Sequence, residues 1–340
     1  MISGTRRALL AGIAISPFAG SAARAARAAP VGRITRFDPA LDPVLDVTSP
    51  IEVIASGYRW AEGPVWVRDG GYLLFSDVPA NVVHRWQPGV GARPFLAPSG
   101  LVGAVPDGIR EAGANGLAID SAGALIMADS GTRAIARVEL ASRHKTILAD
   151  RFEGKRFNSC NDVTIAREGS IYFTDPPYGL ADGDASPLKE LGFNGVFRLS
   201  PDGSLSVVDR SLRRPNGVAL SPHEDRLYVA CSDEARPEIR VYGLSADGTV
   251  NGEGRPFVDF SDALARKLPG LPDGLKVART GHLFASGPGG IYVIAPDGTK
   301  LGLISTGKAI ANCAFGEDGR TLFLTSSDMV ARVRLKLSGW

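Results

Sequence analysis

Apolar and polar residues follow one repeated pattern along the chain. An acidic or amide residue, in most copies followed by a small one, opens a short apolar run, and a second run of alternating character begins 10 or 11 residues later. The six openings are Glu62-Gly63, Asn115-Gly116, Asn161-Asp162, Asn216-Gly217, Asp273-Gly274 and Asn312-Cys313. Their partner runs are 73–77, 125–129, 171–175, 227–231, 283–287 and 322–326. Short alternating runs are typical of β-strands, so each opening and its partner predict a hairpin.

Six copies of one unit, spaced by roughly 40–55 residues, predict a radial array of four-stranded sheets. The expected fold class is all-β, a six-bladed β-propeller. One domain over residues 51–340 is favoured, because each blade needs its neighbours to bury its faces. Candidate strands of the first blade are 51–55, 65–68, 73–76 and 82–87, and residues 29–50 are expected to wrap that blade as an extended arm. The strongest helical pattern, over 260–268, predicts one short helix.

Residues 1–28 have the composition of an export signal. Arg6 and Arg7 stand directly before an apolar stretch that reaches about Gly20, and 23–25 and 26–28 are both A-x-A cleavage candidates. The arginine pair resembles a twin-arginine signal, and the stretch is too short to span a bilayer as a permanent helix. A Sec-type signal and an uncleaved anchor are the alternatives. We expect a periplasmic or secreted protein with no stable membrane insertion after signal removal.

The charge balance argues against two classes of partner. The chain has a net charge of +2, yet residues 1–28 contain four arginines and no acidic residue or lysine. The remainder is therefore close to neutral and has no basic excess for nucleic acid or an anionic membrane. We expect no nucleic-acid partner, and the oligomeric state is left open.

The six opening residues share an oxygen-bearing side chain, and the innermost strands that carry them are expected to line the propeller axis. Together they supply carboxylate and amide oxygens with two formal negative charges. Such a ring is costly to bury without a cation. Oxygen donors suit Ca²⁺, whereas Zn²⁺ favours His or Cys, and the four histidines share no ligand spacing. The pattern predicts a central metal site with one divalent ion, Ca²⁺ before others, although a single Asn-Gly or Asp-Gly is also typical of a turn.

Two segments are longer than a hairpin connection requires. Residues 98–114 are rich in glycine, and residues 176–194 contain Pro-Pro-Tyr-Gly followed by acidic and small residues. Long connections in compact folds are usually functional or mobile. We expect at least one of them to cover the channel mouth.

The three cysteines are too few for a disulfide framework, and their number is odd. Cys160 and Cys313 adjoin two of the openings and are expected to be small buried apolar residues. The sequence also contains no G-x-S-x-G, no phosphate-binding G-x-x-x-x-G-K-[ST] and no H-E-x-x-H. Nucleophilic-serine, phosphate-loop and zinc-protease chemistries therefore have no motif here.

Seven short motifs stand in a fixed order within roughly residues 35–335. They are W-A-E-G-P-V-W (60–66), A-N-G-L (114–117), E-G-K-R-F-N-S-C-N-D-V (153–163), F-T-D-P-P-Y-G-L (173–180), F-N-G-V-F-R-L-S-P-D-G (193–203), R-P-N-G-V-A-L-S-P (214–222) and P-D-G-L (272–275). As an ordered set they resemble the regucalcin/gluconolactonase-like family, and its bacterial gluconolactonase-type branch most closely.

The resemblance implies a six-bladed propeller with one divalent metal, often Ca²⁺, and hydrolysis of a small-molecule sugar lactone. By position, Glu62, Asn216 and Asp273 match the family's metal ligands. Asn161 matches a position that binds metal or substrate, depending on the member. Asp273 also matches the catalytic acid/base, and Asn115 lies in the motif that faces the pocket, which makes it a candidate for substrate contact.

Two residues depart from the family pattern. Cys160 stands where this branch often has Pro, beside Asn161. Ser159 stands where animal relatives have an Arg that contacts sugar, which leaves the identity and ring size of the lactone open.

The leading hypothesis is metal-assisted opening of a lactone, with the carbonyl oxygen on the cation and Asp273 taking a proton from the attacking water. One alternative is a phosphotriesterase-like hydrolase on the same site, with Asp273 as nucleophile or base. The other is a non-catalytic calcium-binding propeller that binds a sugar or a partner, since fold alone does not decide function.

Overall fold

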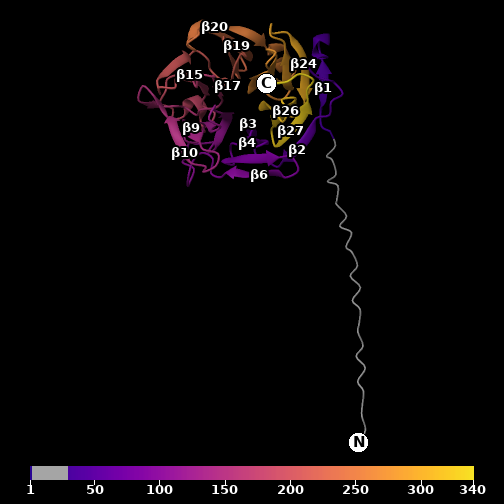
Figure 1. Cartoon of the computed structure of the whole chain (residues 1–340). Helices are drawn as coiled ribbons and strands as arrows, with labels where there is room; N and C mark the ends of the chain where they lie inside the picture. Colours follow the sequence, from indigo (N-terminus) through magenta and orange to yellow (C-terminus); the bar gives the residue numbers. More distant parts are fainter. Residues whose placement is uncertain (2–29) are drawn as a thin grey trace.

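The computed structural model describes Met1 and residues 30–340, so the expected export signal lies outside the described residues, Met1 excepted. Six antiparallel sheets stand around one axis, and Figure 1 looks along that axis. Five sheets have four strands and one has five. The expectation of an all-β six-bladed propeller is confirmed.

The first three blades follow the chain in order. Blade 1 contains β3 (Ala61–Val67), β4 (Tyr72–Asp77), β5 (Val82–Gln87) and β6 (Gly91–Leu96). Blade 2 contains β7 (Ala114–Ile119), β8 (Leu125–Asp129), β9 (Ala134–Val138) and β10 (Lys145–Ala149). Blade 3 contains β13 (Val163–Ile165), β14 (Ile171–Asp175), β15 (Gly195–Leu199) and β16 (Leu205–Asp209).

Blade 4 again follows the chain in order, whereas blades 5 and 6 each include one strand from the beginning of the chain. Blade 4 contains β17 (Pro215–Leu220), β18 (Arg226–Cys231), β19 (Glu238–Leu244) and β20 (Val250–Asp259). Blade 5 contains β21 (Leu275–Val277), β22 (Leu283–Gly287), β23 (Gly290–Ile294) and β24 (Lys300–Ser305), with β1 (Arg33–Arg36) at its edge. Blade 6 contains β25 (Asn312–Gly316), β26 (Thr321–Ser326), β27 (Met329–Arg334) and β2 (Glu52–Ser56).

A few short elements lie between the blades. A two-stranded hairpin joins β11 (Arg151–Phe152) and β12 (Lys155–Arg156). The elements of helical type are the 3₁₀ turns η1 (Pro39–Leu41) and η2 (Gly183–Ala185) and the helix α1 (Ser261–Ala265). The helix α1 falls inside the stretch where the sequence predicted one. Across the described residues, none of these helices has the length and apolar character that a bilayer span requires.

The N-terminal segment closes the ring, and here the sequence prediction was wrong. The run at 51–55 was expected to begin the first blade, but β2 is the outer strand of blade 6 and pairs with β27, Glu52 opposite Arg332. The arm before it adds β1 to blade 5, Arg33 opposite Ser305, instead of wrapping blade 1. In Figure 1 both indigo strands lie against the yellow end of the chain. Pairing the first strands with the last sheets ties the two ends of the ring together, which a linear pattern of repeats does not reveal.

Each opening and its partner run form the two inner strands of a blade, as predicted. Glu62 in β3 lies opposite Ser76 in β4, and Asn312 in β25 lies opposite Thr325 in β26. The first strands of successive blades contact one another around the axis: β3 with β7, β7 with β13, and onward through β17, β21 and β25 back to β3. The six opening residues are thereby carried on or next to the strands that surround the channel.

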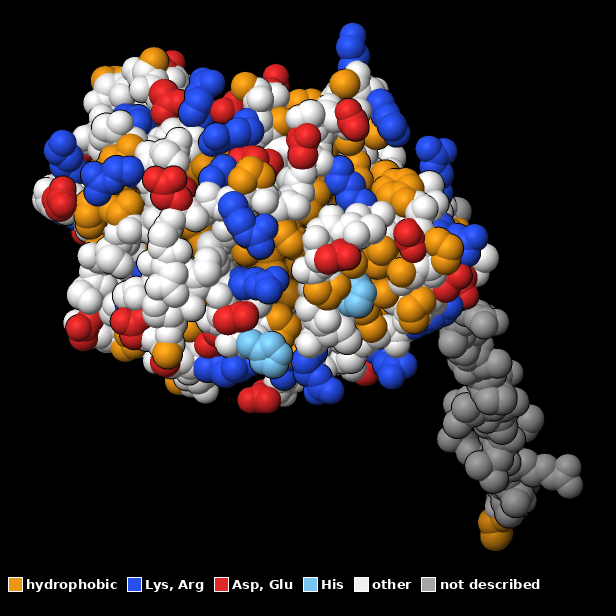
Figure 2. All heavy atoms as spheres, turned by 90° about the horizontal axis from the view of Figure 1, so that it is seen from above, with side chains coloured by type: hydrophobic (Ala, Val, Ile, Leu, Met, Phe, Trp, Pro, Cys, Tyr) orange, Lys and Arg blue, Asp and Glu red, His pale blue; other side chains and the backbone are white. Residues whose placement is uncertain are grey.

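The apolar core fills the spaces between blades. One cluster joins blades 1 and 2 through Leu74 and Met127, and another joins blades 5 and 6 through Phe284 and Leu324. Leu74, Met127, Phe284 and Leu324 are fully buried. On the face shown in Figure 2, basic and acidic side chains of the described residues are interspersed among apolar ones. The blades are therefore held by side-by-side burial of their faces.

Candidate functional site

Three of the inner strands leave the regular ladder where an opening residue stands. The register shifts between Glu62 and Val65 in β3, between Ala114 and Leu117 in β7, and between Pro215 and Val218 in β17. A bulge inserts an unpaired residue and re-aims the side chains beside it. The polar openings are thus built into the strands themselves, and the alternative reading of Asn-Gly as a tight turn does not hold in β7 or β17.

The glycine after an opening residue is required by the close approach of neighbouring inner strands. A Cβ atom at Gly63 would lie 1.9 Å from the carbonyl oxygen of Asn115. A Cβ at Gly217 would lie 2.2 Å from the carbonyl oxygen of Asp273, and one at Gly274 would lie 1.9 Å from Cγ of Asn312. No side chain fits at such distances, so the repeated dipeptide reflects crowding at the axis.

Three carboxyl groups share the interior around the axis. Burial and, less strongly, the charge of Asp162 raise the pKa of Glu62 to about 8, against hydrogen bonds from Gly63 and Asn312 and the charge of Lys276. Burial also raises the pKa of Asp273, and the charges of Glu62 and Asp162 act in the same direction. The pKa of Asp162 is raised by burial and is opposed first by Lys276. Carboxyl groups this close and this dry resist ionisation unless a cation joins them.

The side-chain oxygen of Asn216 is buried and has no hydrogen-bond partner among the described residues. Its Nδ2 donates to Oγ of Ser232 at 2.9 Å, and Ser232 Oγ donates to the carbonyl oxygen of Pro272 at 2.5 Å. The amide is therefore held in one orientation by a neighbouring blade. An orphaned buried acceptor in a native fold calls for a partner from outside the chain.

These donors fit a hard divalent cation. Glu62 and Asp273 supply carboxylate oxygens and Asn216 supplies a neutral one, which is the donor chemistry that Ca²⁺ takes. Among the described residues no three His, Cys, Asp and Glu side chains stand together as a ready cage, so amide oxygens must complete the set. The structure thus places Asn216 in hydrogen-bonding contact with Asp273, and Glu62 near enough for its charge to act on Asp273. That these three residues hold a metal stays a prediction.

The fourth candidate ligand, Asn161, is buried, and its backbone spans the gap between blades. Its carbonyl oxygen accepts from the Gly116 N–H at 2.7 Å, and its own N–H donates to the carbonyl oxygen of Thr174 at 2.9 Å. Thr174 in turn donates its hydroxyl to the carbonyl oxygen of Asn216 at 2.6 Å. Asn161 is therefore linked through one residue to Asn216, and its side-chain amide has no hydrogen-bond partner among the described residues.

The candidate substrate contact, Asn115, is 5% exposed and lies in β7 next to blade 1. Its carbonyl oxygen accepts the hydroxyl of Ser76 at 2.8 Å, while its side-chain amide is unbonded within the described part of the chain. Asn115 is thus held by its backbone, as Asn161 is.

Asn312 supports the site from inside and does not offer an open donor. Its Nδ2 donates to Oε2 of Glu62 at 3.3 Å. Its Oδ1 accepts from the Cys313 N–H at 2.9 Å and from Nζ of Lys276 at 3.3 Å. The six openings look equivalent in the sequence, but Asn312 differs from the others because it connects Lys276 to the candidate ligand Glu62.

A set of hydroxyl groups that the sequence reasoning did not use connects the blades near the site. In five blades, a Ser or Thr at or next to the end of the second strand donates its hydroxyl to a backbone carbonyl oxygen in the opening segment of the next blade. The pairs are Ser76 to Asn115, Ser130 to Cys160, Thr174 to Asn216, Ser232 to Pro272 and Ser286 to Ile310. The signal was present, since each of the six partner runs has a Ser or Thr at its penultimate or last position or directly after it.

The three cysteines are buried and free, as expected for small apolar residues. Cys160 packs with Phe157 and Phe173 in blade 3. Burial raises the pKa of the Cys313 thiol to about 12, so this thiol stays protonated. Neither cysteine beside an opening takes part in the polar cluster through its side chain.

The two long segments meet each other, and their side chains reach the site. The N–H of Arg110 donates to the carbonyl oxygen of Gly179 at 2.8 Å, and the N–H of Ala181 donates to that of Gly108 at 2.8 Å. The charge of Glu111 raises the pKa of Asp273, and the charge of Asp273 raises that of Tyr178. The hydroxyl of Ser159, two residues before Asn161, donates to the carbonyl oxygen of Pro176 at 2.6 Å and accepts from the Gly179 N–H at 2.8 Å. Both segments are therefore held next to the opening segment of blade 3, and that one of them covers the channel mouth stays a prediction.

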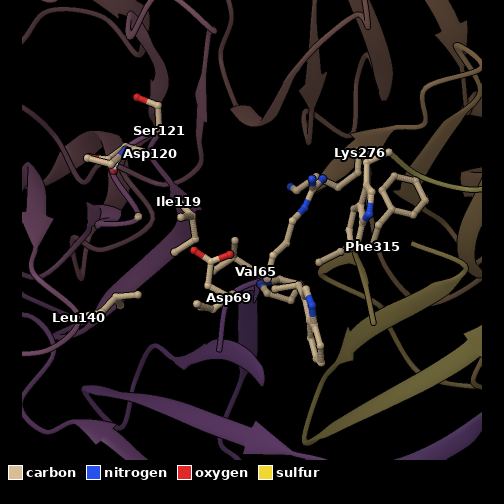
Figure 3. A pocket seen from close by; sticks show the side chains of 16 residues that line it. Val65, Asp69, Ile119, Asp120, Ser121, Leu140, Lys276 and Phe315 are labelled. Atoms are coloured by element: carbon tan, nitrogen blue, oxygen red, sulfur yellow. Dashed lines mark hydrogen bonds between the residues drawn. The ribbon is translucent and has the colours of Figure 1, made fainter. Parts of the chain in front are cut away.

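A separate hollow of about 580 Å³ lies at the other end of the inner strands. It is lined by Val65–Val67 at the end of β3 and by Arg68 and Asp69 just after it, whereas Glu62 stands at the beginning of that strand. Figure 3 shows Lys276 and Phe315 on one side of it and Ile119 and Leu140 on the other. This hollow is thus distinct from the carboxylate cluster, and Lys276 stands between the two.

A six-bladed propeller with buried carboxylate and amide oxygens at one end of its axis is the class of protein that these observations define. The model of the SMP-30/Gluconolactonase/LRE-like region matches residues 60–328. The chain belongs to this family, and the resemblance seen in its motifs is confirmed.

Individual relatives agree with this assignment. A gluconolactonase from Zymomonas mobilis subsp. mobilis is 50% identical over 312 residues, which cover 91% of this chain and 88% of that protein. The solved structure of a gluconolactonase from Xanthomonas campestris is 31% identical, with a TM-score of 0.77, over 90% of this chain and 97% of that one. Regucalcin from Agrobacterium tumefaciens, described as a calcium-binding protein, is 17% identical with a TM-score of 0.65 over 91% and 96% of the two chains, a likeness of fold.

Proposed function

We propose that the protein is a metal-dependent lactonase that opens a sugar lactone by water attack. The identity to a gluconolactonase over most of the chain supports lactonase activity. The observation that carries the metal-dependent part is the unpartnered Oδ1 of Asn216 beside Glu62 and Asp273, two carboxyl groups whose pKa values are raised by burial and by neighbouring carboxylate charges. A divalent cation satisfies the amide oxygen and removes the electrostatic cost of both carboxylates at once.

The ion is Ca²⁺ in this proposal, held by Glu62, Asn161, Asn216 and Asp273. When bound, a divalent cation acts as a Lewis acid toward a carbonyl oxygen. Ser232 and Thr174 orient Asn216 through its amide and its carbonyl, and Asn312 orients Glu62. Partners that orient the ligands of a metal commonly set its affinity.

Asp273 is the general base and acid of the reaction. Its carboxylate takes a proton from the attacking water as the new C–O bond forms, and it returns the proton to the ring oxygen as the ester bond breaks. The product is the open hydroxy acid, which releases a proton near neutral pH. Coordination lowers the basicity of a carboxylate, and the burial that raises the pKa of Asp273 works against that loss. In this proposal Asn115 contacts the substrate that is bound next to Asp273.

Asp273→Asn separates the two roles of this residue, since the amide keeps one oxygen donor and loses the base. We expect turnover of glucono-1,5-lactone to be abolished while Ca²⁺ binding, followed by calorimetry, is largely retained. Asp297→Asn is the matched control, because Asp297 caps an exposed turn through the Thr299 N–H at 2.9 Å. Near wild-type turnover by Asp273→Asn would refute its role.

The same preparation decides between this function and the two alternatives. Higher turnover of a phosphotriester than of any lactone would favour the phosphotriesterase-like hydrolase. Loss of thermal stability on chelation, with no turnover of either ester class, would favour a calcium-binding propeller without catalysis.

We also propose export through the twin-arginine-like signal at residues 1–28, which leaves the mature protein periplasmic or secreted. The arginine pair and the A-x-A sites of the sequence support it. Intact-mass measurement of the exported protein tests it, and a retained N-terminus would contradict cleavage.

A further inference from the structure

The two long segments, 98–114 and 176–194, form one paired unit. Besides the two backbone hydrogen bonds at Gly179 and Gly108, Ile109 forms an isolated antiparallel bridge with Leu180. The Arg110 guanidinium donates to the carbonyl oxygen of Tyr178. The connection between blades 1 and 2 is thereby fixed against the long loop of blade 3. This antiparallel pairing places Glu111 opposite Tyr178.

Both of these residues present a buried polar atom without a partner. Oε2 of Glu111 makes no hydrogen bond with any described residue. The buried hydroxyl of Tyr178 makes none of ordinary geometry, although the Ser232 side chain lies close enough to it to lower its pKa. The other carboxylate oxygen of Glu111 accepts from Arg110 at 3.5 Å, and its side chain is 17% exposed. Buried acceptors and hydroxyls are nearly always bonded in native folds, so two of them on one paired unit indicate groups that a ligand satisfies.

The two groups face the candidate base. Burial raises the pKa of Tyr178 above its usual range, and the neighbouring Ser232 hydroxyl opposes that shift. Ser232 Oγ accepts from Nδ2 of Asn216 at 2.9 Å and donates to the carbonyl oxygen of Pro272, the residue before Asp273, at 2.5 Å. The charge of Glu111 contributes to the raised pKa of Asp273. Tyr178 therefore lies beside the residue that holds Asn216 and the segment before Asp273, and Glu111 is carried on the segment paired with it. A molecule bound at Asn216 and Asp273 lies within reach of both.

Ser159 holds the segment that carries Tyr178 in place. Its hydroxyl donates to the carbonyl oxygen of Pro176 at 2.6 Å and accepts from the Gly179 N–H at 2.8 Å. A Cβ at Gly179 would lie 2.7 Å from the Cβ of Ser159, so the contact is tight. Ser159 therefore anchors the segment that carries Tyr178, and its hydroxyl is already bonded on both sides.

We propose that Glu111 and Tyr178 bind hydroxyl groups of the substrate and make the site selective for a polyhydroxylated lactone over an unsubstituted lactone of the same ring size. A phenol hydroxyl donates and accepts, and a carboxylate accepts, which together match the two roles of a sugar hydroxyl. A substrate that lacks the hydroxyl leaves these buried atoms unpaired, which is the basis of strong discrimination. This inference rests on the proposed lactonase function.

The test compares kcat/KM for glucono-1,5-lactone with kcat/KM for δ-valerolactone, the same six-membered ring without hydroxyl groups. For Tyr178→Phe and for Glu111→Gln we expect the ratio of the two values to fall by about 10-fold or more relative to the wild type. The loss should lie mainly in KM for the sugar lactone, because a hydroxyl contact is made in the ground state and the transition state alike.

Tyr72→Phe is the matched control. Tyr72 begins β4, and its ring lies under the Arg85 guanidinium, 3.8 Å from Cζ to the ring centroid. This variant should leave the ratio unchanged. Melting curves of each variant show that it is folded.

The possible results distinguish the failure of this recognition role from the failure of the proposed lactonase function. Equal losses on both lactones, or an unchanged ratio in both variants, would overturn the recognition role while leaving the lactonase proposal standing. Hydrolysis of neither lactone by the wild-type protein would overturn both.

Discussion

Gly274→Ala tests whether the crowded axis holds Asn312, and through it Glu62, in place. A Cβ at position 274 would lie 1.9 Å from Cγ of Asn312 and 2.2 Å from both its Oδ1 and Nδ2. The backbone of Gly274 is not left-handed, so the added methyl itself causes no backbone strain. The Asn312 amide must move, and it is held by hydrogen bonds to Glu62, Lys276 and the Cys313 N–H.

The magnitude follows from those three bonds. Each contributes roughly 1 kcal/mol, so their loss costs about 3 kcal/mol of the free energy of unfolding. For a chain of this size that corresponds to a melting temperature lower by about 6–12 °C. Glu62 loses its side-chain donor as well, so Ca²⁺ affinity should fall together with stability.

Thermal denaturation in chelator and in excess Ca²⁺ measures both effects. Gly192→Ala is the matched control, since a Cβ there meets nothing within 4 Å, and it should melt within about 1 °C of the wild type. In an Asn312→Ala background the obstacle is gone, so adding Gly274→Ala should cost about 0.5 kcal/mol or less. Equal cost of Gly274→Ala in both backgrounds would refute the reasoning.

Three other perturbations act on the same cluster. Without metal, the pKa of Glu62 is raised from 4.5 to about 8, so the folded state holds a proton that the unfolded chain releases. Stability of the metal-free protein should therefore fall as pH rises through this interval, and Glu62→Gln should flatten the fall in melting curves recorded against pH. Lys276→Met removes the charge that lowers the pKa values of Glu62 and Asp162, so more protons should be released when Ca²⁺ binds near pH 7, which calorimetry in buffers of different ionisation enthalpy measures; unchanged proton release would exclude this support. Ser232→Ala should cost about 1–2 kcal/mol and weaken Ca²⁺ binding because Asn216 loses its anchor. Ser204→Ala, in an exposed turn, is its control, and equal effects of the two would contradict the role of Ser232.

The blade architecture could be predicted from the sequence because it depends on a local signal that repeats. The distance from Asn115 to the run at 125 is set by one hairpin, and the same hairpin recurs six times. The closure of the ring could not be predicted in this way. It depends on pairing Glu52 with Arg332, 280 residues apart, and no local pattern records such a contact.

The candidate site was predictable in its residue types but not in how they divide their roles. All six openings carry oxygen donors, yet Asn216 presents an unpartnered oxygen while the oxygen of Asn312 is bonded to Lys276 and Cys313. That difference depends on which neighbouring blade supplies a donor. The roles of Glu111 and Tyr178 were hidden for the same reason, because they become neighbours only when two distant segments pair.

The most direct test of metal-dependent lactone opening is proton release from glucono-1,5-lactone. The rate is recorded with the protein as prepared, after removal of divalent ions by a chelator, and after return of Ca²⁺ or another divalent ion. The proposed site predicts that activity is lost on chelation and restored by the ion, with no recovery in Asp273→Asn. Full activity in the chelated protein would contradict a catalytic metal at Glu62, Asn216 and Asp273.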